Sequence, residues 1–181
     1  GPVRILTVAR FESYKDYPTA FRAIRLLKER LMGVPIEYRV LGTGSLETEV
    51  KQMIVTEGLS DVVKLVLDPN DIDRHYRECD IFLLTSIQEG FSNTILEAMA
   101  HSLPIVATNV GDNSTLVLQG ENGFLADPAD AQKLADYLAD LVINVSKRKA
   151  VGMTAYEMVK SKFGIEAFSK NYERFLSQLL K

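Results

Sequence analysis

The chain has 181 residues, of which 46% are apolar and 25% charged, and its formal net charge is −3. This length and composition fit one folded domain with a sizeable core and argue against a disordered chain. The net negative charge excludes the overall basicity by which many nucleic-acid-binding domains are recognised, so no nucleic-acid partner is expected.

The opening Gly1-Pro2 reads as the remnant of a protease cleavage site, and we expect one domain over residues 3–181. The longest apolar run, Ile81–Leu84, is too short to cross a bilayer. The single cysteine, Cys79, excludes an internal disulfide framework and favours a reducing compartment. We therefore expect a cytoplasmic protein, with the inner face of the membrane as a second setting for the full-length protein.

Short apolar runs alternate with longer amphipathic segments along the whole chain. The runs are typical of strands covered on both faces, and they lie at Val3–Ala9, Ile36–Leu41, Val62–Leu67, Ile81–Thr85, Pro104–Thr108 and Gly123–Ala126. Helices are predicted between them at Pro18–Leu31, Leu46–Glu57, Asp71–Glu78, Asn93–Ala100 and Asn113–Leu118. This order predicts an α/β domain, a Rossmann-like doubly wound parallel sheet with helices on both faces.

Two further helices are predicted near the end of the chain. The first begins in the segment Asp127-Pro128-Ala129-Asp130, with Asp127 as its N-cap and Pro128 as its first helical residue. The second begins at about Ala167 and carries an apolar stripe of Phe168, Tyr172, Phe175, Leu176, Leu179 and Leu180. Because this stripe is wide for the edge of a small domain, we expect either self-association through the helix or rapid amide exchange after about Gly164.

Ligands of doubly wound domains bind at the carboxyl ends of the strands, where the strand order changes direction. Arg10 and Lys15 follow the first strand and can converge on a small anion, although a pair of solvated surface cations remains the alternative. Gly42 and Gly44 follow the second strand and allow close approach of the backbone to a ligand. They lack the full dinucleotide fingerprint because Glu47 stands where the third glycine belongs.

The loop after the fourth strand is the most informative segment. Gly90 can take backbone angles that other residues resist, and Ser92 or Asn93 can cap the following helix, whose N-terminus attracts a phosphate. Two carboxylates, Glu89 and Glu97, flank this phosphate site and would repel it unless they face something else. Sugar and ribose hydroxyls are suitable partners because a carboxylate accepts two hydrogen bonds from a vicinal diol. The alternative is that both glutamates are solvated.

The segment EGFSNTILEAMA, followed by LPIVATNVG and GENGFLADP, closely resembles the signature of glycosyltransferase family 4, a group of retaining enzymes with the two-domain GT-B fold. The two glutamates of that pattern, separated by seven residues, match Glu89 and Glu97, and its early arginine and lysine match Arg10 and Lys15. The resemblance covers nearly the whole chain, which would be the C-terminal half of the fold.

The resemblance implies a role for each of these residues. Glu97 would bind the ribose of the donor nucleotide and Glu89 the transferred sugar, while Arg10 and Lys15 would bind the diphosphate. The diphosphate would also lie against the loop and helix start formed by Gly90, Phe91, Ser92, Asn93 and Thr94. The base would lie near Gly42, Gly44, Leu67, Asp68 and Pro69. The donor would be a nucleoside-diphosphate sugar, with uridine diphosphate favoured over guanosine or adenosine diphosphate. No metal or other cofactor would be needed.

Some positions depart from the family pattern or carry weaker signals. Ser102 replaces a frequent helix-ending glycine, and the stretch from Gly111 to Thr115 lacks a usual glutamate. The DxD pattern of Asp71-Ile72-Asp73 is interpreted as a helix start rather than a metal site. His75 and His101 are interpreted as surface or structural residues and Cys79 as a buried thiol.

The sequence thus favours the donor-binding half of a sugar-transfer enzyme of hexosyltransferase type that acts in polysaccharide or glycoconjugate synthesis. The acceptor, a glycan or lipid-linked glycan, would bind a missing N-terminal domain, so the chain alone should be inactive. A GT-B nucleotide-sugar epimerase and a non-enzymatic nucleotide-sugar-binding regulatory module are the alternatives.

Overall fold

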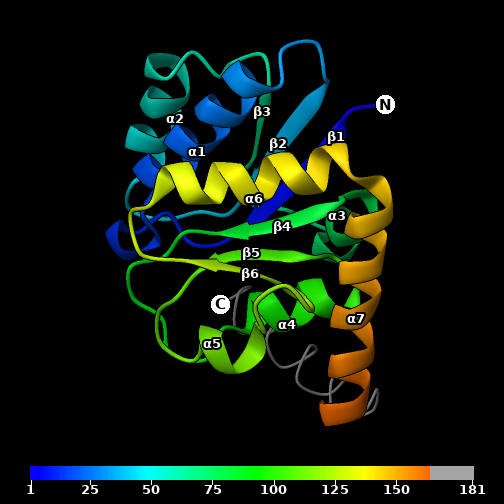
Figure 1. Cartoon of the computed structure of the whole chain (residues 1–181). Helices are drawn as coiled ribbons and strands as arrows, with labels where there is room; N and C mark the ends of the chain where they lie inside the picture. The colour runs from blue at the N-terminus through cyan, green and yellow to red at the C-terminus, as the bar shows by residue number, and fades with distance from the viewer. Residues whose placement is uncertain (164–181) are drawn as a thin grey trace.

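The computed structural model describes residues 1–163, which form a six-stranded parallel sheet between two layers of helices (Figure 1). The strands are β1 (Val3–Val8), β2 (Ile36–Leu41), β3 (Val63–Val66), β4 (Ile81–Leu84), β5 (Ile105–Thr108) and β6 (Gly123–Ala126). Their order in the sheet is β3-β2-β1-β4-β5-β6, and each neighbouring pair is parallel. The predicted doubly wound α/β fold is confirmed.

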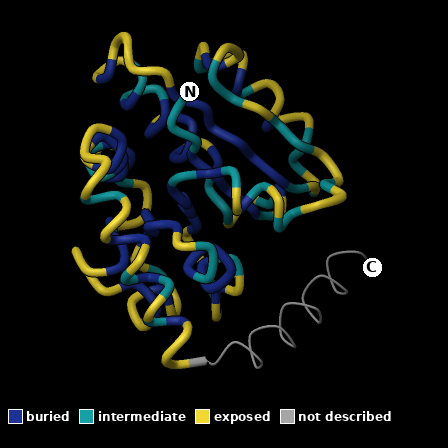
Figure 2. The backbone as a smooth tube through the Cα atoms, turned by 90° about the vertical axis from the view of Figure 1, so that its right-hand side faces the viewer, coloured by how far each residue is buried: buried dark blue, intermediate teal, exposed yellow. Residues whose placement is uncertain are grey.

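The helices connect successive strands and cover both faces of the sheet. They are α1 (Tyr17–Arg30), α2 (Glu47–Thr56), α3 (Ile72–Glu78), α4 (Asn93–Ala100), α5 (Asn113–Leu116), α6 (Ala131–Ile143) and α7 (Val145–Phe163), with a short 3-10 helix, η1, at Ser13–Lys15. Apolar side chains of α1, α2 and α6 form one core cluster against the sheet. Those of α3, α4, α5 and α7 form a second cluster on the other face. Most of the strands between them are largely buried (Figure 2). The prediction that the third strand is covered on both faces is wrong, because β3 lies at the edge of the sheet and has no buried residue.

The start of α6 differs from the prediction. Asp130, not Asp127, is the N-cap, and its carboxylate accepts a hydrogen bond from the Lys133 amide at 2.9 Å. Asp127 and Pro128 instead belong to a turn that ends at Ala129, whose φ of +63° lies outside the helical region. The predicted Asp127 cap and Pro128 helix start are therefore wrong, because the left-handed Ala129 prevents the helix from starting before it.

Helix α7 has no counterpart among the predicted elements. Its buried side chains are small, Val151, Gly152, Ala155 and Val159, and most of its remaining residues are polar. A wide stripe of large apolar residues, the usual sequence signal of an amphipathic helix, is absent from this segment of the described chain. The helix predicted from about Ala167, together with its apolar stripe, lies outside the described residues.

The end of α4 shows how Ser102 replaces the expected glycine. Ser102 itself adopts a left-handed φ of +59°. Its amide bonds to the Met99 carbonyl at 3.0 Å, and the Leu103 amide bonds to the Ala98 carbonyl at 3.0 Å. These two bonds form a Schellman motif, so the helix ends in the usual way at the cost of a strained serine.

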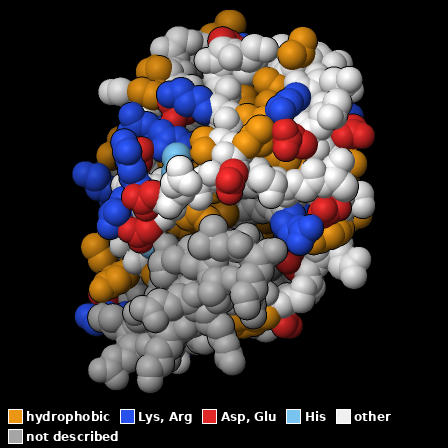
Figure 3. Space-filling view, turned by 180° about the vertical axis from the view of Figure 1, so that it is seen from behind, with side chains coloured by type: hydrophobic (Ala, Val, Ile, Leu, Met, Phe, Trp, Pro, Cys, Tyr) orange, Lys and Arg blue, Asp and Glu red, His pale blue; other side chains and the backbone are white. Residues whose placement is uncertain are grey.

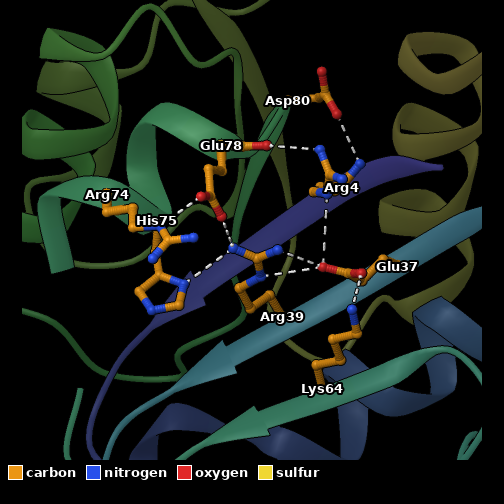
Figure 4. Close-up of polar contacts among 8 residues, drawn as sticks. All are labelled: Arg4, Glu37, Arg39, Lys64, Arg74, His75, Glu78 and Asp80. Carbon is orange, nitrogen blue, oxygen red and sulfur yellow. Dashed lines mark hydrogen bonds and ion pairs between the residues drawn. The ribbon is translucent and has the colours of Figure 1, made fainter. Parts of the chain in front are cut away.

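Paired charges fill one part of the sheet face around α3 (Figure 4). The Glu37 and Arg39 side chains, each 9% exposed, are joined at 2.7 Å, and Lys64 bonds to Glu37 at 2.6 Å. Arg39 also contacts Glu78 at 2.8 Å and the Nδ1 of His75 at 3.1 Å. Since arginine only donates, Nδ1 accepts this bond, and burial lowers the pKa of His75. This agrees with the structural role expected for that histidine.

Charged side chains of both signs gather on the back of the molecule (Figure 3). Among residues 1–163, no helix is both long and apolar enough to cross a membrane.

Candidate functional site

The strand order reverses between β1 and β4, which lie side by side at the centre of the sheet. From β1 the chain continues outward through β2 to β3, and from β4 it continues in the opposite direction through β5 to β6. The loops that follow β1 and β4 therefore diverge at the carboxyl edge of the sheet, where doubly wound domains bind their ligands. The predicted residues Arg10, Lys15 and Glu89 all lie on these two loops.

Backbone and side-chain bonds connect the two loops. The Ile87 amide donates to the Tyr14 carbonyl at 2.8 Å, and the Thr85 hydroxyl donates to the Lys15 carbonyl at 3.0 Å. The Lys15 ammonium contacts Glu89 Oε1 at 2.5 Å, with the two side chains only 14% and 10% exposed. The Ser86 hydroxyl donates to the same oxygen at 2.6 Å. Lys15 and Glu89 are thus held together at the switch point.

Arg10 is not held together with Lys15. Its side chain is 67% exposed and lies 3.5 Å from Glu12. Glu12 in turn accepts hydrogen bonds from the hydroxyl and amide of Ser45, at 2.8 and 3.4 Å. These bonds, the first of them above all, lower the pKa of Glu12. In the structure each cation faces its own carboxylate, so convergence of the two on one anion would require the Arg10 side chain to turn.

Helix α4 begins in the same loop and presents its N-terminus. Ser92 occupies the N-cap position and is buried, but its side chain makes no capping bond and instead lies 3.4 Å from the Thr94 hydroxyl. The expected side-chain cap is therefore wrong, for Asn93 as well, because Asn93 is already the first helical residue. A helix start without a side-chain cap has amide donors and a partial positive charge available for an anion.

Gly90 and Phe91 form the exposed turn before α4, and Phe91 is 49% exposed. Gly90 does not use the backbone freedom that glycine allows, because its φ is not positive. A Cβ added to Gly90 would meet no heavy atom of the described chain within 4 Å. The packing inside residues 1–163 therefore does not require glycine there.

Gly111 is a contributor that sequence reasoning did not identify. It has a φ of +52°, and an added Cβ would lie 2.0 Å from the Glu89 carbonyl oxygen. The next amide, that of Asp112, donates to the Gly90 carbonyl at 3.2 Å. The loop after β5 thus supports the loop that carries Glu89, although it lacks the usual glutamate. Its signal was a glycine three residues after the end of a strand, which by itself does not reveal its partner.

Glu97 lies one turn into α4 and points into the protein. Only 2% of the residue is exposed, and its Oε2 accepts a hydrogen bond from the Tyr76 hydroxyl at 2.8 Å. Its Oε1 is buried and has no hydrogen-bond partner among the described residues. Burial raises the pKa of Glu97 to about 8. The alternative of a solvated glutamate at this position is wrong.

Gly42 and Gly44 pack closely against the backbone of another loop of the protein. An added Cβ would lie 2.0 Å from the Ala9 carbonyl oxygen at Gly42, and 2.6 Å from the Phe11 amide nitrogen at Gly44. The two glycines therefore allow the loop after β2 to pack on the loop after β1. The close approach that these glycines allow is thus to the protein's own backbone, whereas the sequence analysis expected close approach to a ligand.

The other residues predicted near the base, Leu67, Asp68 and Pro69, follow β3 at the edge of the sheet. Leu67 and Asp68 are exposed, and Asp68 has a φ of +48°. The strand order places this segment two strands away from β1. Among the described residues, no hydrogen bond or ion pair joins this segment to Lys15 or Glu89, so their common role stays a prediction.

The weaker signals have structural explanations. Asp71 is the N-cap of α3 and accepts from the Arg74 amide at 3.0 Å, while Asp73 contacts His101 and Arg77. Within residues 1–163 there is no group of three or more His, Cys, Asp or Glu side chains placed to hold a metal ion. Cys79 is buried, and burial raises the pKa of its thiol to about 12.

The chain is similar to known proteins over most of its length. The family model described as glycosyl transferases group 1 matches residues 1–158. The amylovoran biosynthesis glycosyltransferase AmsK of Erwinia amylovora is 34% identical over 98% of this chain and 45% of its own length. The D-inositol 3-phosphate glycosyltransferase of Paenarthrobacter aurescens is 31% identical over 83% of this chain and 38% of its own. The chain spans less than half the length of these curated relatives.

Solved structures share the fold. The C-terminal domain of the glycosyl transferase group 1 family protein LpcC of Francisella tularensis superimposes with a TM-score of 0.80 at 25% identity, over 91% of this chain and 87% of that one. HepE of Anabaena, solved with UDP-glucose, superimposes with a TM-score of 0.83 at 24% identity, over 99% of this chain and 50% of that one.

Proposed function

The chain belongs to the group 1 family of glycosyl transferases, and we propose that it is the donor-binding, C-terminal half of a retaining GT-B enzyme. In this role it binds a nucleoside-diphosphate sugar, and the whole protein transfers the sugar to an acceptor hydroxyl during polysaccharide or glycoconjugate synthesis. The names of relatives such as AmsK and the capsular polysaccharide protein CapM support this setting. The UDP-glucose bound by HepE supports a uridine nucleotide.

One observation carries the proposal. At the switch point a largely buried Lys15–Glu89 pair connects two loops, and the loop that carries Glu89 leads into α4, whose start has no side-chain cap. Helix α4 itself carries a buried carboxyl, Glu97, with one oxygen unpaired among the described residues. Cations and helix amides suit a diphosphate, and carboxylates suit hydroxyl groups. A nucleoside-diphosphate sugar contains both kinds of group.

We propose that the diphosphate binds at the N-terminus of α4. The amides of Ser92, Asn93 and Thr94 would donate to the phosphate oxygens, and the Lys15 ammonium would lie beside them. Arg10, which is exposed and pairs only loosely with Glu12, would turn to close the site. These groups would stabilise the negative charge that develops on the departing diphosphate, without a metal ion.

Glu89 would bind the transferred sugar. Lys15 and Ser86 both contact its Oε1, so Oε2 would remain for hydroxyl groups of the sugar. The bond between the anomeric carbon and the phosphate oxygen would break as the acceptor oxygen bonds on the same face, which retains the configuration. The leaving phosphate oxygen would take the proton of the acceptor hydroxyl. The acceptor itself would bind the part of the protein outside this chain.

The test is a calorimetric titration of the chain with UDP, GDP and ADP in EDTA, together with Arg10→Ala. We expect binding to survive EDTA, and Arg10→Ala to weaken it by roughly 1.5–3 kcal/mol, the scale of a charge-assisted hydrogen bond. Arg30→Ala is the matched control, because Arg30 is also exposed and paired, with Asp136. Failure of all three nucleotides to bind the parent chain would contradict the proposed function. An unchanged affinity in Arg10→Ala would contradict only the role of Arg10.

A further inference from the structure

The two oxygens of the Glu97 carboxyl differ in their hydrogen bonding. Oε2 accepts the hydroxyl of Tyr76 at 2.8 Å, whereas Oε1 is buried with no partner among the described residues. Tyr76 is wholly buried and lies on α3, 21 residues before Glu97 in the chain. One oxygen of the carboxyl is thus attached to a neighbouring helix while the other is left for a group outside the described chain.

The ring of Tyr76 packs against neighbours on α4 and β4. It stacks on His101 of the α4 end, with ring centroids 5.1 Å apart and planes at 17°, and it packs against Phe82 at 6.1 Å. His101 contacts Asp73 of α3 at 2.7 Å through Nε2 and the Glu97 carbonyl at 2.7 Å through Nδ1. The Tyr76 hydroxyl therefore has little freedom to leave the Glu97 carboxyl.

A purely structural pairing would not leave this pattern. Buried carboxyl oxygens in folded proteins are normally hydrogen-bonded, and an unpaired one is costly. In a core of Ile95, Leu96 and Met99 side chains, an apolar residue would fill position 97 without that cost. A carboxyl that is firmly held at one oxygen and unpaired at the other is suited to accept a hydrogen bond from a ligand.

We propose that Tyr76 is a positioning residue for ribose recognition, which holds the Glu97 carboxyl so that Oε1 receives the hydroxyls of the donor nucleotide. The inference rests on the proposed function, since it assumes that a nucleotide binds at this edge. It adds that discrimination between ribose and its deoxy forms depends on α3, through a hydroxyl that does not itself touch the ligand.

The test compares nucleotides with and without ribose hydroxyls. UDP and 2′,3′-dideoxyuridine diphosphate are titrated into the parent chain, Tyr76→Phe and Tyr38→Phe. GDP and ADP, each with its own 2′,3′-dideoxy form, are titrated in the same way, which makes six nucleotides. Tyr38→Phe is the matched control, because Tyr38 is also a fully buried tyrosine whose hydroxyl is bonded, to Thr7, but in the core of the opposite face. Thermal unfolding of each variant shows whether it is folded.

We expect Tyr76→Phe to bind UDP about tenfold or more weakly and the dideoxy compound unchanged, so that the preference for ribose falls. Tyr38→Phe should keep the parent preference. Combining Tyr76→Phe with Glu97→Gln should weaken UDP binding by less than the product of the single effects, because both changes remove one arrangement.

Three results would count against the inference. If Tyr76→Phe weakened both nucleotides equally, or neither, the tyrosine would be a structural residue only. If the parent chain bound none of the six nucleotides, the proposed function would be wrong and the inference with it. If Tyr76→Phe did not fold, the weaker Asp73→Asn change would test the same helix contact, and an unaltered ribose preference in that variant would overturn the proposal.

Discussion

Burial of the Glu97 carboxyl makes the stability of the domain depend on pH. Its pKa in the folded protein is about 8, above the ordinary value of 4.5. Between these two values the folded state keeps a proton that the unfolded chain has lost, so the contribution of Glu97 to stability falls as the pH rises. This contribution is greatest below about 4.5 and is lost by the folded-state pKa of about 8, above which it no longer changes.

We therefore expect Glu97→Gln to become more stable relative to the parent as the pH rises from 5 to 8, by up to about 1.4 kcal/mol per pH unit. Urea unfolding of both proteins at pH 5, 6, 7, 8 and 9 measures the difference. Other carboxyls, such as Glu78 with its pKa lowered to about 2, are common to both proteins and cancel. Parallel pH profiles for the two proteins would show that Glu97 is ionised in the folded state throughout.

Two glycines of the candidate site should differ in how much stability alanine costs at their positions. Gly90→Ala meets no atom of the described chain within 4 Å, so stability should change by less than about 0.5 kcal/mol. Gly111→Ala puts a Cβ 2.0 Å from the Glu89 carbonyl oxygen at a left-handed φ, and should cost about 2 kcal/mol or more. Chemical unfolding measures both.

Nucleotide binding by Gly90→Ala also tests where the diphosphate binds. If the diphosphate passes close to the turn before α4, Gly90→Ala should weaken UDP binding at least about tenfold while the fold is intact. An unchanged affinity would place the ligand away from Gly90.

At the scale of elements, the contact between α4 and α7 depends on a glycine inside a helix. Gly152 lies against the end of α4, where an added Cβ would be 2.0 Å from the Ser102 carbonyl oxygen and 3.2 Å from Pro104. Alanine raises intrinsic helix propensity by about 1 kcal/mol relative to glycine, whereas the clash forces the two helices apart. Since the contacting atom is backbone and Ser102 is already strained, we expect the clash to prevail.

Gly152→Ala should therefore destabilise the protein by about 1–3 kcal/mol, the range for overpacking a core. Thr154→Ala, two residues later on the same helix, should change stability by less than about 0.5 kcal/mol and is the control. A more stable Gly152→Ala in urea unfolding would mean that α7 is less tightly packed on α4 than the structure shows.

At the scale of the whole molecule, this chain spans less than half the length of the curated relatives named above. Under the proposed function the donor binds here and the acceptor binds the remainder. We expect the chain alone to bind a nucleoside diphosphate and to transfer no sugar, because proximity of the two reactants is then lost. Incubation with radiolabelled UDP-glucose and glycan acceptors, against a blank without protein, measures this. Transfer above the blank would contradict the division of the site between two halves.

Much of the fold could be predicted from local patterns. Each of the six predicted strands is present, and no end differs by more than one residue, because most of the strands are buried and show as largely apolar runs. The helix start at Asp71 was also recognised from its residue type. Helix α7 was missed because its buried face is made of Val151, Gly152, Ala155 and Val159, which leave no strong apolar stripe.

For the candidate site, too, some features could be predicted from the sequence and others could not. Its position at the strand ends, and the residues Lys15, Glu89 and Glu97, came from motif and spacing. Their partners did not, because Lys15 and Glu89 are 74 residues apart and Tyr76 and Glu97 are 21 apart, on different elements. Spacing along one element cannot show which residue of another element will face it.

The sequence by itself determined the order and type of the main elements up to α6, the apolar character of most strands and the edge of the sheet at which the candidate site lies. These depend on residues near one another in the chain, through hydrophobic periodicity and backbone preference. Only the tertiary structure decided the strand order, the close packing that requires Gly42, Gly44 and Gly111, and the burial of Glu97 beside Tyr76. These depend on contacts between distant segments, which exist only once the sheet has assembled and its two cores have formed around it.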